Sequence, residues 1–401
     1  MKKYFVVLAA LLLCGGVRAA SSPTSAGKAA GRAGTVAEKF HRKAASRHGN
    51  IFFSPYSMYS AFAMVYEGAR GQTASEMSRV FGFPAERGDL RLDFSLLRDE
   101  LAKSAGSSEF SQANAFWYQK DYKFLPEYQE ALRSRYSASA EASDFKKDPE
   151  AVRLAVNSWT DKQTKGKIKD LFAKGSFRQS MRLVLVNAVY FKGKWKKQFR
   201  KQDTWEQEFT LLSGSKIKTP IMESPGYVNV RYYKTDSFQA AALPYAGGGL
   251  EMLVILPGPG ERLSEIEKNL TEEKIAAIRS GLRGEEVKVF LPRFRFSDDW
   301  DLGPELSALG MPLAFTFPGA DLSGMDGKKD LFIQKAVQKA FIEVNEEGTE
   351  AAAATGVAMM PGSAAGKRQP VVFRADRPFI FVIEDSRTGL ILFMGRLADP
   401  R

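Results

Sequence analysis

Cysteine and histidine are nearly absent from this sequence. Among 401 residues, Cys14 is the only cysteine, and His41 and His48 are the only histidines. Because Cys14 lies in an N-terminal segment that we expect to be removed, the mature chain has no thiol for a disulfide, a catalytic nucleophile or a thiolate metal site. The two histidines lie in no recognisable catalytic motif and leave little for a transition-metal site. We therefore expect no metal ion and no other cofactor.

The patterns of common enzyme classes are also missing. The sequence has no Gly-x-Ser-x-Gly nucleophile elbow, and the glycine-bounded run at 362–366 is not one. Acidic pairs such as Asp298-Asp299 lie in polar runs that are typical of a solvated surface. No nucleic-acid-binding motif accompanies the formal net charge of +12. These absences predict a protein that is not an enzyme and that does not bind nucleic acid.

The N-terminus has the pattern of a secretion signal. Lys2 and Lys3 precede an apolar run at 4–13 that is too short to span a bilayer. Val17 and Ala19 are the small residues that a signal peptidase requires, so we place cleavage after Ala19. Residues 1–19 are thus predicted to be a signal peptide, and the protein is expected to be secreted and extracellular, or periplasmic in a bacterium.

Two further expectations concern this end of the chain. A lipoprotein anchored through Cys14 is the alternative, but Leu13 precedes it where a small residue would be expected. Residues 20–35 are rich in Ser, Ala and Gly and are predicted to be a flexible leader. Nothing in the remainder resembles an interdomain linker, and 44% of the chain is hydrophobic, so 36–401 should form one domain.

Basic residues are densest in one segment of the chain. Removing Lys2, Lys3 and Arg18 with the signal peptide lowers the net charge from +12 to +9. The remaining charges are spread widely except for a basic cluster made of Lys192, Lys194, Lys196, Lys197, Arg200 and Lys201. This cluster is a candidate polyanion site, although such a run is more often a solvated face.

A run of small residues is the most unusual segment of the chain. Residues 340–344 alternate in the period-2 pattern of a half-buried strand, which should end at Glu346. Gly348 then offers backbone freedom, and from Ala351 no large side chain follows until Val357. Such a segment can be an Ala-rich linker or a helical turn. It can also fold back and enter the sheet, because small residues meet no steric obstacle on either face.

Other segments have clear secondary-structure patterns. Residues 54–68 begin with a good N-cap and a proline and predict a helix with one apolar face. Residues 183–191 are almost continuously apolar and predict a central strand in which Asn187 needs buried hydrogen-bond partners. Residues 263–283 are predicted to form one helix, and 380–394 a buried hairpin.

These segments together resemble the serpin family. Residues 344–355 are similar to the hinge of the reactive centre loop in inhibitory serpins, and matching blocks follow in the expected order from about 50 to 400. The resemblance implies an α+β serpin fold, with three β-sheets, about eight or nine helices and an exposed reactive centre loop at about 346–372.

The resemblance also implies a mechanism. Serpins are suicide inhibitors: a serine protease attacks the loop and forms an acyl-enzyme, and the cut loop then inserts into the main sheet and distorts the protease. The partner would therefore be a target serine protease in a covalent acyl complex with a monomeric inhibitor. The hinge residues implied are Glu346, Glu347, Gly348, Thr349, Glu350, Ala351, Ala352, Ala353, Ala354 and Thr355.

A group of polar residues is implied to lie where the sheet opens. Ser54, Ser57 and Asn187 resemble the polar cluster of that region, and Trp195 resembles the residue beneath the top of the opening. Gln338 stands where family members usually have histidine. A glutamine can donate and accept hydrogen bonds but cannot titrate, so the network here is expected to differ.

The bond that the protease cuts is less well defined. Family spacing counted from Gly348 leads to Gly362-Ser363, which we favour, whereas spacing counted back from Pro378 leads to Lys367, so the distal part of the loop is long. Gly362, or the alternative pair Met359 and Met360, would suit an elastase- or subtilisin-like protease. Lys367 or Arg368 would suit a trypsin-like one.

Three other functions remain open at this stage. One is a non-inhibitory serpin that acts as a carrier, a chaperone or a simple protease substrate, although its hinge usually has bulky or charged residues. Another is cross-class inhibition of cysteine proteases. The third is a secreted scaffold or adhesion protein, which would show no protease-dependent change.

Overall fold

A computed structural model describes residues 24–136, 139–349 and 371–401. Its helices are α1 (Ser25–Ala44), α2 (Pro55–Gly68), α3 (Gly71–Phe81), α4 (Arg87–Ala105), α5 (Pro126–Ala131), α6 (Pro149–Gln163), α7 (Leu263–Lys268), α8 (Glu272–Gly281), α9 (Leu302–Ala308) and α10 (Ser323–Asp326). Among these described residues, none of the helices is both long enough and apolar enough to cross a membrane.

The strands form two hydrogen-bonded sheets. The six-stranded sheet has the order β11-β12-β13-β4-β2-β3, with β2 (Glu109–Gln119), β3 (Ser139–Ser143), β4 (Leu183–Lys194), β11 (Phe294–Asp301), β12 (Lys335–Val344) and β13 (Gly348–Thr349). The ten-stranded sheet has the order β1-β16-β15-β9-β8-β7-β10-β6-β5, with β14 beside β10. Its strands are β1 (Ile51–Phe53), β5 (Thr204–Thr210), β6 (Lys216–Glu223), β7 (Val228–Lys234), β8 (Phe238–Pro244), β9 (Leu250–Pro257), β10 (Arg283–Pro292), β14 (Val371–Arg374), β15 (Phe379–Asp385) and β16 (Ile391–Leu397).

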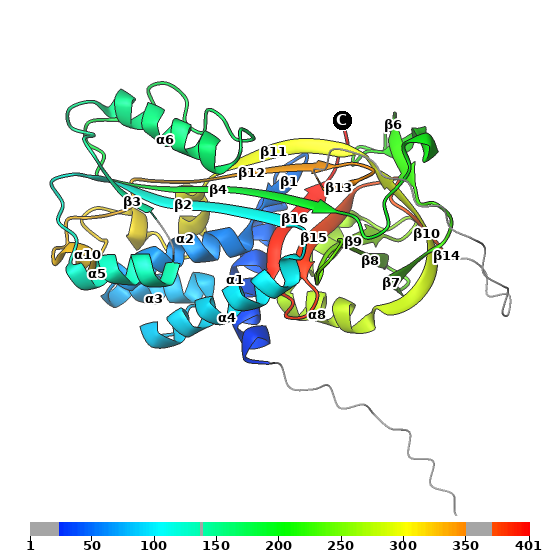
Figure 1. The fold of residues 1–401 in the computed structure, drawn as a ribbon, viewed down its shortest axis with the longest axis horizontal. Helices are drawn as coiled ribbons and strands as arrows, with labels where there is room; N and C mark the ends of the chain where they lie inside the picture. Colours follow the sequence, from blue (N-terminus) through cyan, green and yellow to red (C-terminus); the bar gives the residue numbers. More distant parts are fainter. Residues whose placement is uncertain (1–23, 137–138, 350–370) are drawn as a thin grey trace, which may run out of the picture.

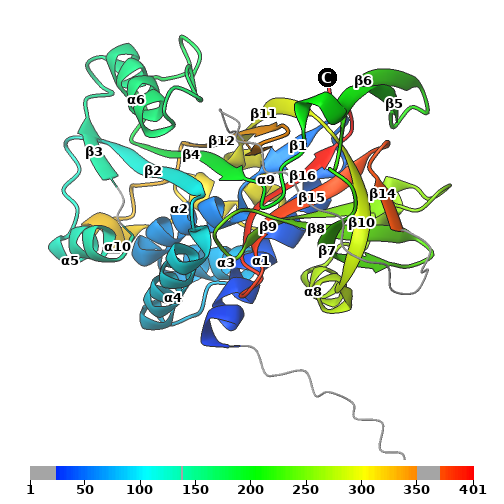
Figure 2. The same cartoon turned by 45° about the vertical axis from the view of Figure 1, so that its right-hand side comes forward.

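The six-stranded sheet lies between two layers of helix. Helix α6 covers one face, and α2 packs against β2 and β4 on the other, with the remaining N-terminal helices behind it (Figures 1 and 2). Val152 and Val156 of α6 are buried against Trp117, Val184 and Val337 of the sheet. Both faces of β4 are therefore covered, as its nearly continuous apolar sequence predicts.

The α+β class is confirmed, but two details differ from expectation. The described residues contain ten α-helices instead of eight or nine, because short helices such as α7 and α10 add to the count. The described strands form two hydrogen-bonded sheets instead of the three that were expected. The reason is β10, which pairs with β7 along its first half and with β6 near its end, and so bridges what would otherwise be separate sheets.

The prediction of a flexible leader at 20–35 is wrong from Ser25 onward. Helix α1 begins there, and the Thr24 side chain caps it by accepting a hydrogen bond from the Gly27 N–H at 3.1 Å. Its small residues are a packing face instead of a sign of disorder: Ala29, Ala30 and Ala33 are at most 2% exposed. The buried alanines belong to the same core cluster as apolar residues of α2 and α4, against which α1 packs.

Candidate functional site

The two central strands of the six-stranded sheet are joined along only part of their length. Strands β4 and β12 run parallel and pair from Val184 with Lys335 to Tyr190 with Phe341. Beyond this point they separate, and β13 lies between them. Thr349 pairs with Val344 of β12 and with Gly193 of β4, in both cases antiparallel. The two residues of β13 therefore form the start of a strand inserted between two others.

Glycine at both sides makes this close approach possible. A Cβ atom on Gly348 would lie 2.0 Å from the Gly193 oxygen and 2.7 Å from the Lys194 Cα, distances that no side chain can adopt. A Cβ atom on Gly193 would lie 2.8 Å from the Phe191 ring and 2.9 Å from the Tyr245 ring. Gly348 is thus required by backbone contact with β4 and not only by the turn before it.

The inserted Thr349 faces the interior. It is 1% exposed, and its hydroxyl lies 2.7 Å from the Tyr245 hydroxyl in a hydrogen bond. Burial raises the pKa of Tyr245, so this phenol stays protonated. The Tyr245 ring stacks on Trp195 with a centroid distance of 4.7 Å and an interplanar angle of 9°. A small polar side chain fits this position, whereas a large or charged one does not.

The segment 195–199 holds the turn that leads to β13. The Trp195 backbone N–H donates to the Glu347 carbonyl at 2.9 Å, and its indole N–H donates to the Asn345 carbonyl at 3.0 Å. The Phe199 N–H donates to the Glu346 carbonyl at 2.9 Å. Trp195 therefore lies beside the turn that precedes β13 and holds two of its carbonyls, those of Asn345 and Glu347, while Phe199 holds the carbonyl between them.

The two hinge carboxylates are buried and paired with cations. Glu346 forms an ion pair with Arg293, and Glu347 lies 3.4 Å from Lys201. Burial alone would raise the pKa of Glu346, but hydrogen bonds from Arg293, its own backbone and Thr204 outweigh burial and hold the pKa below its usual value. Glu346 and Glu347 thus fix the start of the hinge through ion pairs with Arg293 and Lys201.

The predicted polar cluster is assembled lower down the same two strands. Gln338 lies directly opposite Asn187 and donates to its Oδ1 at 2.6 Å. Gln338 also accepts from the Ser54 N–H at 2.9 Å and donates to the Ser54 carbonyl at 3.0 Å. Asn187 donates to the Ser57 hydroxyl at 2.6 Å. All four residues are 0% exposed, so this side-chain network links β4, β12 and the start of α2 without water contact.

Gln338 satisfies the hydrogen bonds of this network at the position where the family usually has a histidine. Gln338 uses its carbonyl once and its amide twice, so all three contacts fit one side chain. The Ser54 hydroxyl also donates to the Leu392 carbonyl at 2.6 Å. None of the side chains in this network is titratable, so no proton is gained or lost within it as the pH changes.

Several residues of the site were missed by sequence reasoning. Asn114 of β2 lies directly opposite Asn187 and accepts a hydrogen bond from its amide. An asparagine between two alanines in an apolar strand was the available signal. Tyr245, Phe199 and Arg293 gave no such signal, because ordinary strand and loop residues only become site residues through long-range contacts.

The basic cluster does not form one uniform patch. Arg200 donates to Asp203 at 2.5 Å, and Lys201 is paired with Glu347, so two of the six charges already face carboxylates. The side chains of Lys194, Lys196 and Lys197 are exposed. A polyanion site on this cluster stays a prediction.

Other predicted residues lie outside the described part of the chain. These are the hinge residues from Glu350 to Thr355 and all candidates for the cut bond, Met359, Met360, Gly362, Ser363, Lys367 and Arg368. The signal peptide lies outside it as well. Among the residues at 24–136, 139–349 and 371–401, no group of three or more His, Cys, Asp or Glu side chains could hold a metal ion.

Comparisons with known proteins agree on one family. A family model described as serpin (serine protease inhibitor) matches residues 34–400. An uncharacterized serpin-like protein of Thermococcus kodakarensis is 40% identical over 362 residues, covering 90% of this chain and 83% of that protein. Leukocyte elastase inhibitor A of Rattus norvegicus is 40% identical over 375 residues, covering 90% and 97%. The crystal structure of Serpin48 of the insect Tenebrio molitor matches with a TM-score of 0.83 at 27% identity, covering 96% of this chain and all of that one.

Proposed function

The chain belongs to the serpin family of serine protease inhibitors, and we propose that it is a secreted suicide inhibitor of serine-type endopeptidases. Its partners are accordingly proteases, and it is not itself an enzyme. In the proposed reaction, a protease serine attacks the reactive centre loop and forms an acyl-enzyme. The cut loop then inserts between β4 and β12 and carries the protease with it. Distortion of the protease's oxyanion hole stops deacylation, because that hole supplies several kcal/mol of transition-state stabilisation.

The observation that carries this proposal is the position of β13. Gly348 and Thr349 already occupy the space between the two strands, in a register that a longer insert would continue. Six residues further along, Thr355 would lie opposite Asn187 on β4 and Gln338 on β12, on the same face as Thr349. Every hinge residue from Ala351 to Thr355 is small, so such a strand would meet little steric obstacle.

Insertion would also improve the hydrogen bonding of the sheet. The present parallel ladder between β4 and β12 would be replaced by two antiparallel ladders, and antiparallel pairing is slightly more stable per residue. At about 1 kcal/mol net for each added hydrogen bond, a dozen bonds would contribute on the order of 10 kcal/mol. This is comparable to the stability of a whole domain, so the uncut protein would be metastable and kinetically held.

The favoured cut bond is Gly362-Ser363. A glycine there, or Met359-Met360, fits proteases with small or apolar pockets, and the relative named as a leukocyte elastase inhibitor supports the same class. Lys367 and Arg368 keep a trypsin-like target open. A bond far from the hinge leaves a longer tether and a weaker pull on the protease.

We propose secretion because of the predicted signal peptide at 1–19, and a monomer because the mechanism needs one chain only.

The test is to mix the mature protein with elastase-, subtilisin- and trypsin-like proteases. We expect a covalent complex that survives denaturing electrophoresis, and sequencing of the released C-terminal peptide would identify the cut bond. Clean cleavage without a complex for all three proteases would instead indicate a non-inhibitory serpin.

A hinge variant tests the mechanism more sharply. Thr349→Arg would bring a charge to a position that is 1% exposed, so insertion should stall and the protein should become a substrate. We expect at least about a tenfold loss of complex in favour of cleaved product. Thr349→Ser keeps the hydroxyl that contacts Tyr245 and is the matched control, with complex yield close to that of the parent. Equal complex yield from Thr349→Arg would contradict the insertion mechanism.

A further inference from the structure

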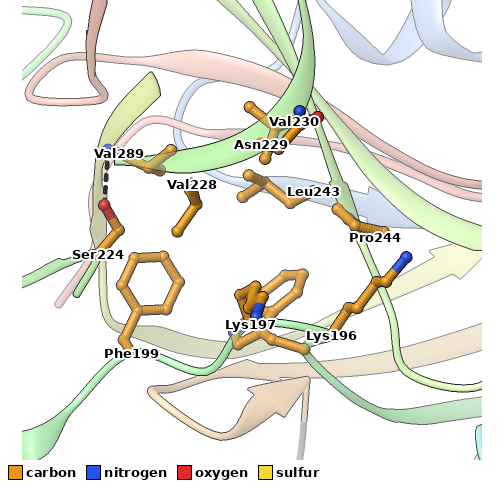
Figure 3. A pocket seen from close by; sticks show the side chains of 11 residues that line it. Lys196, Lys197, Phe199, Ser224, Val228, Asn229, Val230, Leu243, Pro244 and Val289 are labelled. Carbon is orange, nitrogen blue, oxygen red and sulfur yellow. Dashed lines mark hydrogen bonds between the residues drawn. The ribbon is translucent and has the colours of Figure 1, made fainter. Parts of the chain in front are cut away.

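A cavity of about 240 Å³ lies behind the segment that holds the hinge. Figure 3 shows Phe199 and Lys197 along one side, Val228, Leu243 and Pro244 on the other, and Ser224 with Val289 at the end. Its walls come from the 195–199 segment, β7, β8 and β10, so it lies between the inserted hinge and the ten-stranded sheet. The proposed inhibitory mechanism does not use this space.

The inside of the cavity is apolar. Phe199, Val230, Leu243 and Val289 are each at most 8% exposed and present hydrocarbon to the space. The one buried hydroxyl, that of Ser224, is already satisfied: it donates to the Gly226 carbonyl at 2.7 Å and accepts from the Val289 N–H at 3.0 Å. Water needs several polar partners to be held well, so a space of this lining favours an apolar occupant.

The mouth of the cavity is cationic. Lys196 and Lys197 line it, both side chains are exposed, and none of the eleven lining residues is acidic. No carboxylate of the described residues forms an ion pair with either lysine, in contrast to Lys201 of the same basic cluster, which is paired with Glu347. A hydrocarbon-lined space with two exposed ammonium groups beside it, neither of them paired with a carboxylate of the described residues, is complementary to a molecule with an apolar body and one anionic end.

We propose that this cavity binds a small amphipathic organic anion, such as a medium-chain carboxylate. The hydrocarbon part would fill the space between Phe199, Val230 and Leu243, and the carboxylate would lie between Lys196 and Lys197. The occupant would contact Trp195 and Phe199 from the side opposite to the hinge carbonyls that these residues hold. Binding therefore stabilises the hinge-holding segment in the arrangement described here.

The probe for the test is octanoate, titrated into the full mature chain by isothermal titration calorimetry. We expect one binding site, with octan-1-ol binding at least about tenfold more weakly because it lacks the charge, and octyltrimethylammonium not binding measurably. Equal affinity for the acid and the alcohol would overturn the role of the lysines, and absence of octanoate binding would overturn the site.

Two variants locate the site. The double variant Lys196→Gln/Lys197→Gln should weaken octanoate binding at least about tenfold. Its matched control is Lys192→Gln/Lys194→Gln, which removes the same charge from the same basic cluster but changes no lining residue. An equal loss of octanoate affinity in the two double variants would show that the lysines attract the anion non-specifically, and it would overturn the proposal.

A filling variant tests the apolar part. Val230→Phe should occupy the space and abolish binding of both octanoate and octan-1-ol, whereas unchanged binding would exclude this cavity. No protease takes part in any of these measurements. Failure of this proposal is therefore distinguishable from failure of the inhibitory function.

Discussion

The two halves of the β4–β12 pair are held in different ways. The lower half is the part in which residues 184–190 pair with residues 335–341, and the upper half is the part beside β13. In the lower half, the strands pair directly, and the Gln338–Asn187–Ser57 network closes them with fully buried side-chain hydrogen bonds. In the upper half, the strands are apart, and two small residues of the hinge fill the space. The same two strands are thus open at one end and locked at the other.

This difference indicates where insertion would begin and where it would meet resistance. The upper half needs no further separation for the first step, because Thr349 is already seated beside Tyr245. From Ala352 onward, which would lie opposite Tyr190 and Phe341, each inserted residue would have to displace a pair of the lower ladder, including the pair whose side-chain network is centred on Asn187. Buried polar groups that lose their partners cost more than the bonds themselves contribute.

Breaking the lower half should have the largest effect on stability. Asn187→Ala leaves the Gln338 amide and the Ser57 hydroxyl without their shared partner in a site that is 0% exposed. We expect a loss of about 2–4 kcal/mol in the free energy of unfolding, measured by urea denaturation. Asn114→Ala removes only one contact of the same network and is the matched control, with a smaller loss. A loss under about 0.5 kcal/mol for Asn187→Ala would mean that the network does not lock the strands.

Weakening the upper half should have a smaller effect. Tyr245→Phe removes the hydroxyl that bonds Thr349 but keeps the ring that stacks on Trp195. We expect a loss of about 1 kcal/mol in unfolding free energy and faster proteolysis within the hinge. Tyr232→Phe, which removes a partly exposed phenol elsewhere, serves as the control. If both variants lose the same small amount of unfolding free energy, packing alone holds Thr349 in place.

Acid should loosen the upper half slightly and leave the lower network unchanged. Because the folded state holds the pKa of Glu346 below its usual value of 4.5, this carboxylate contributes stability above that value. The contribution is lost as pH falls through the lowered pKa. We expect under about 1 kcal/mol, since Arg293 is half exposed to solvent. Unfolding measured from pH 7 to pH 3 in the parent and in Glu346→Gln checks this.

The expected result is convergence of the two proteins at low pH. Glu346→Gln should be the less stable protein at pH 7 and should lose its disadvantage near pH 3. A constant difference across this range would show that the carboxylate charge plays no part in holding the hinge.

Local patterns predicted the elements that form the site. The capping serine and proline correctly predicted α2 from Pro55 to Gly68, and the apolar run at 183–191 predicted β4. The single helix predicted at 263–283 is wrong: α7 and α8 are separate, because Thr271 caps a new helix by accepting from the Lys274 N–H at 3.2 Å. Capping residues inside a helical pattern were the signal that was overlooked.

Long-range partners could not be predicted from local patterns. Thr349 and Tyr245 are 104 residues apart in sequence, and Glu346 and Arg293 are 53 apart. Nothing within a window of a dozen residues distinguishes Tyr245 from the other tyrosines of the chain. The polar residues Ser54, Ser57, Asn187 and Gln338 were brought together through the family resemblance and not through their spacing. The α1 helix was missed because small residues were interpreted as disorder before their helical spacing was considered.

The order of strands in the ten-stranded sheet has a consequence for biosynthesis. Strands β15 and β16 lie between β1 and β9, although they follow every other strand of this sheet in the sequence. At 5–20 residues per second, a ribosome needs roughly 20–80 seconds for the whole chain. Until β15 and β16 are made, the edges of β1 and β9 that face them have no neighbour, and a chain that stopped before β15 would leave these edges unpaired. Completion of this sheet therefore depends on residues 379–397 and must follow the synthesis of all its other strands.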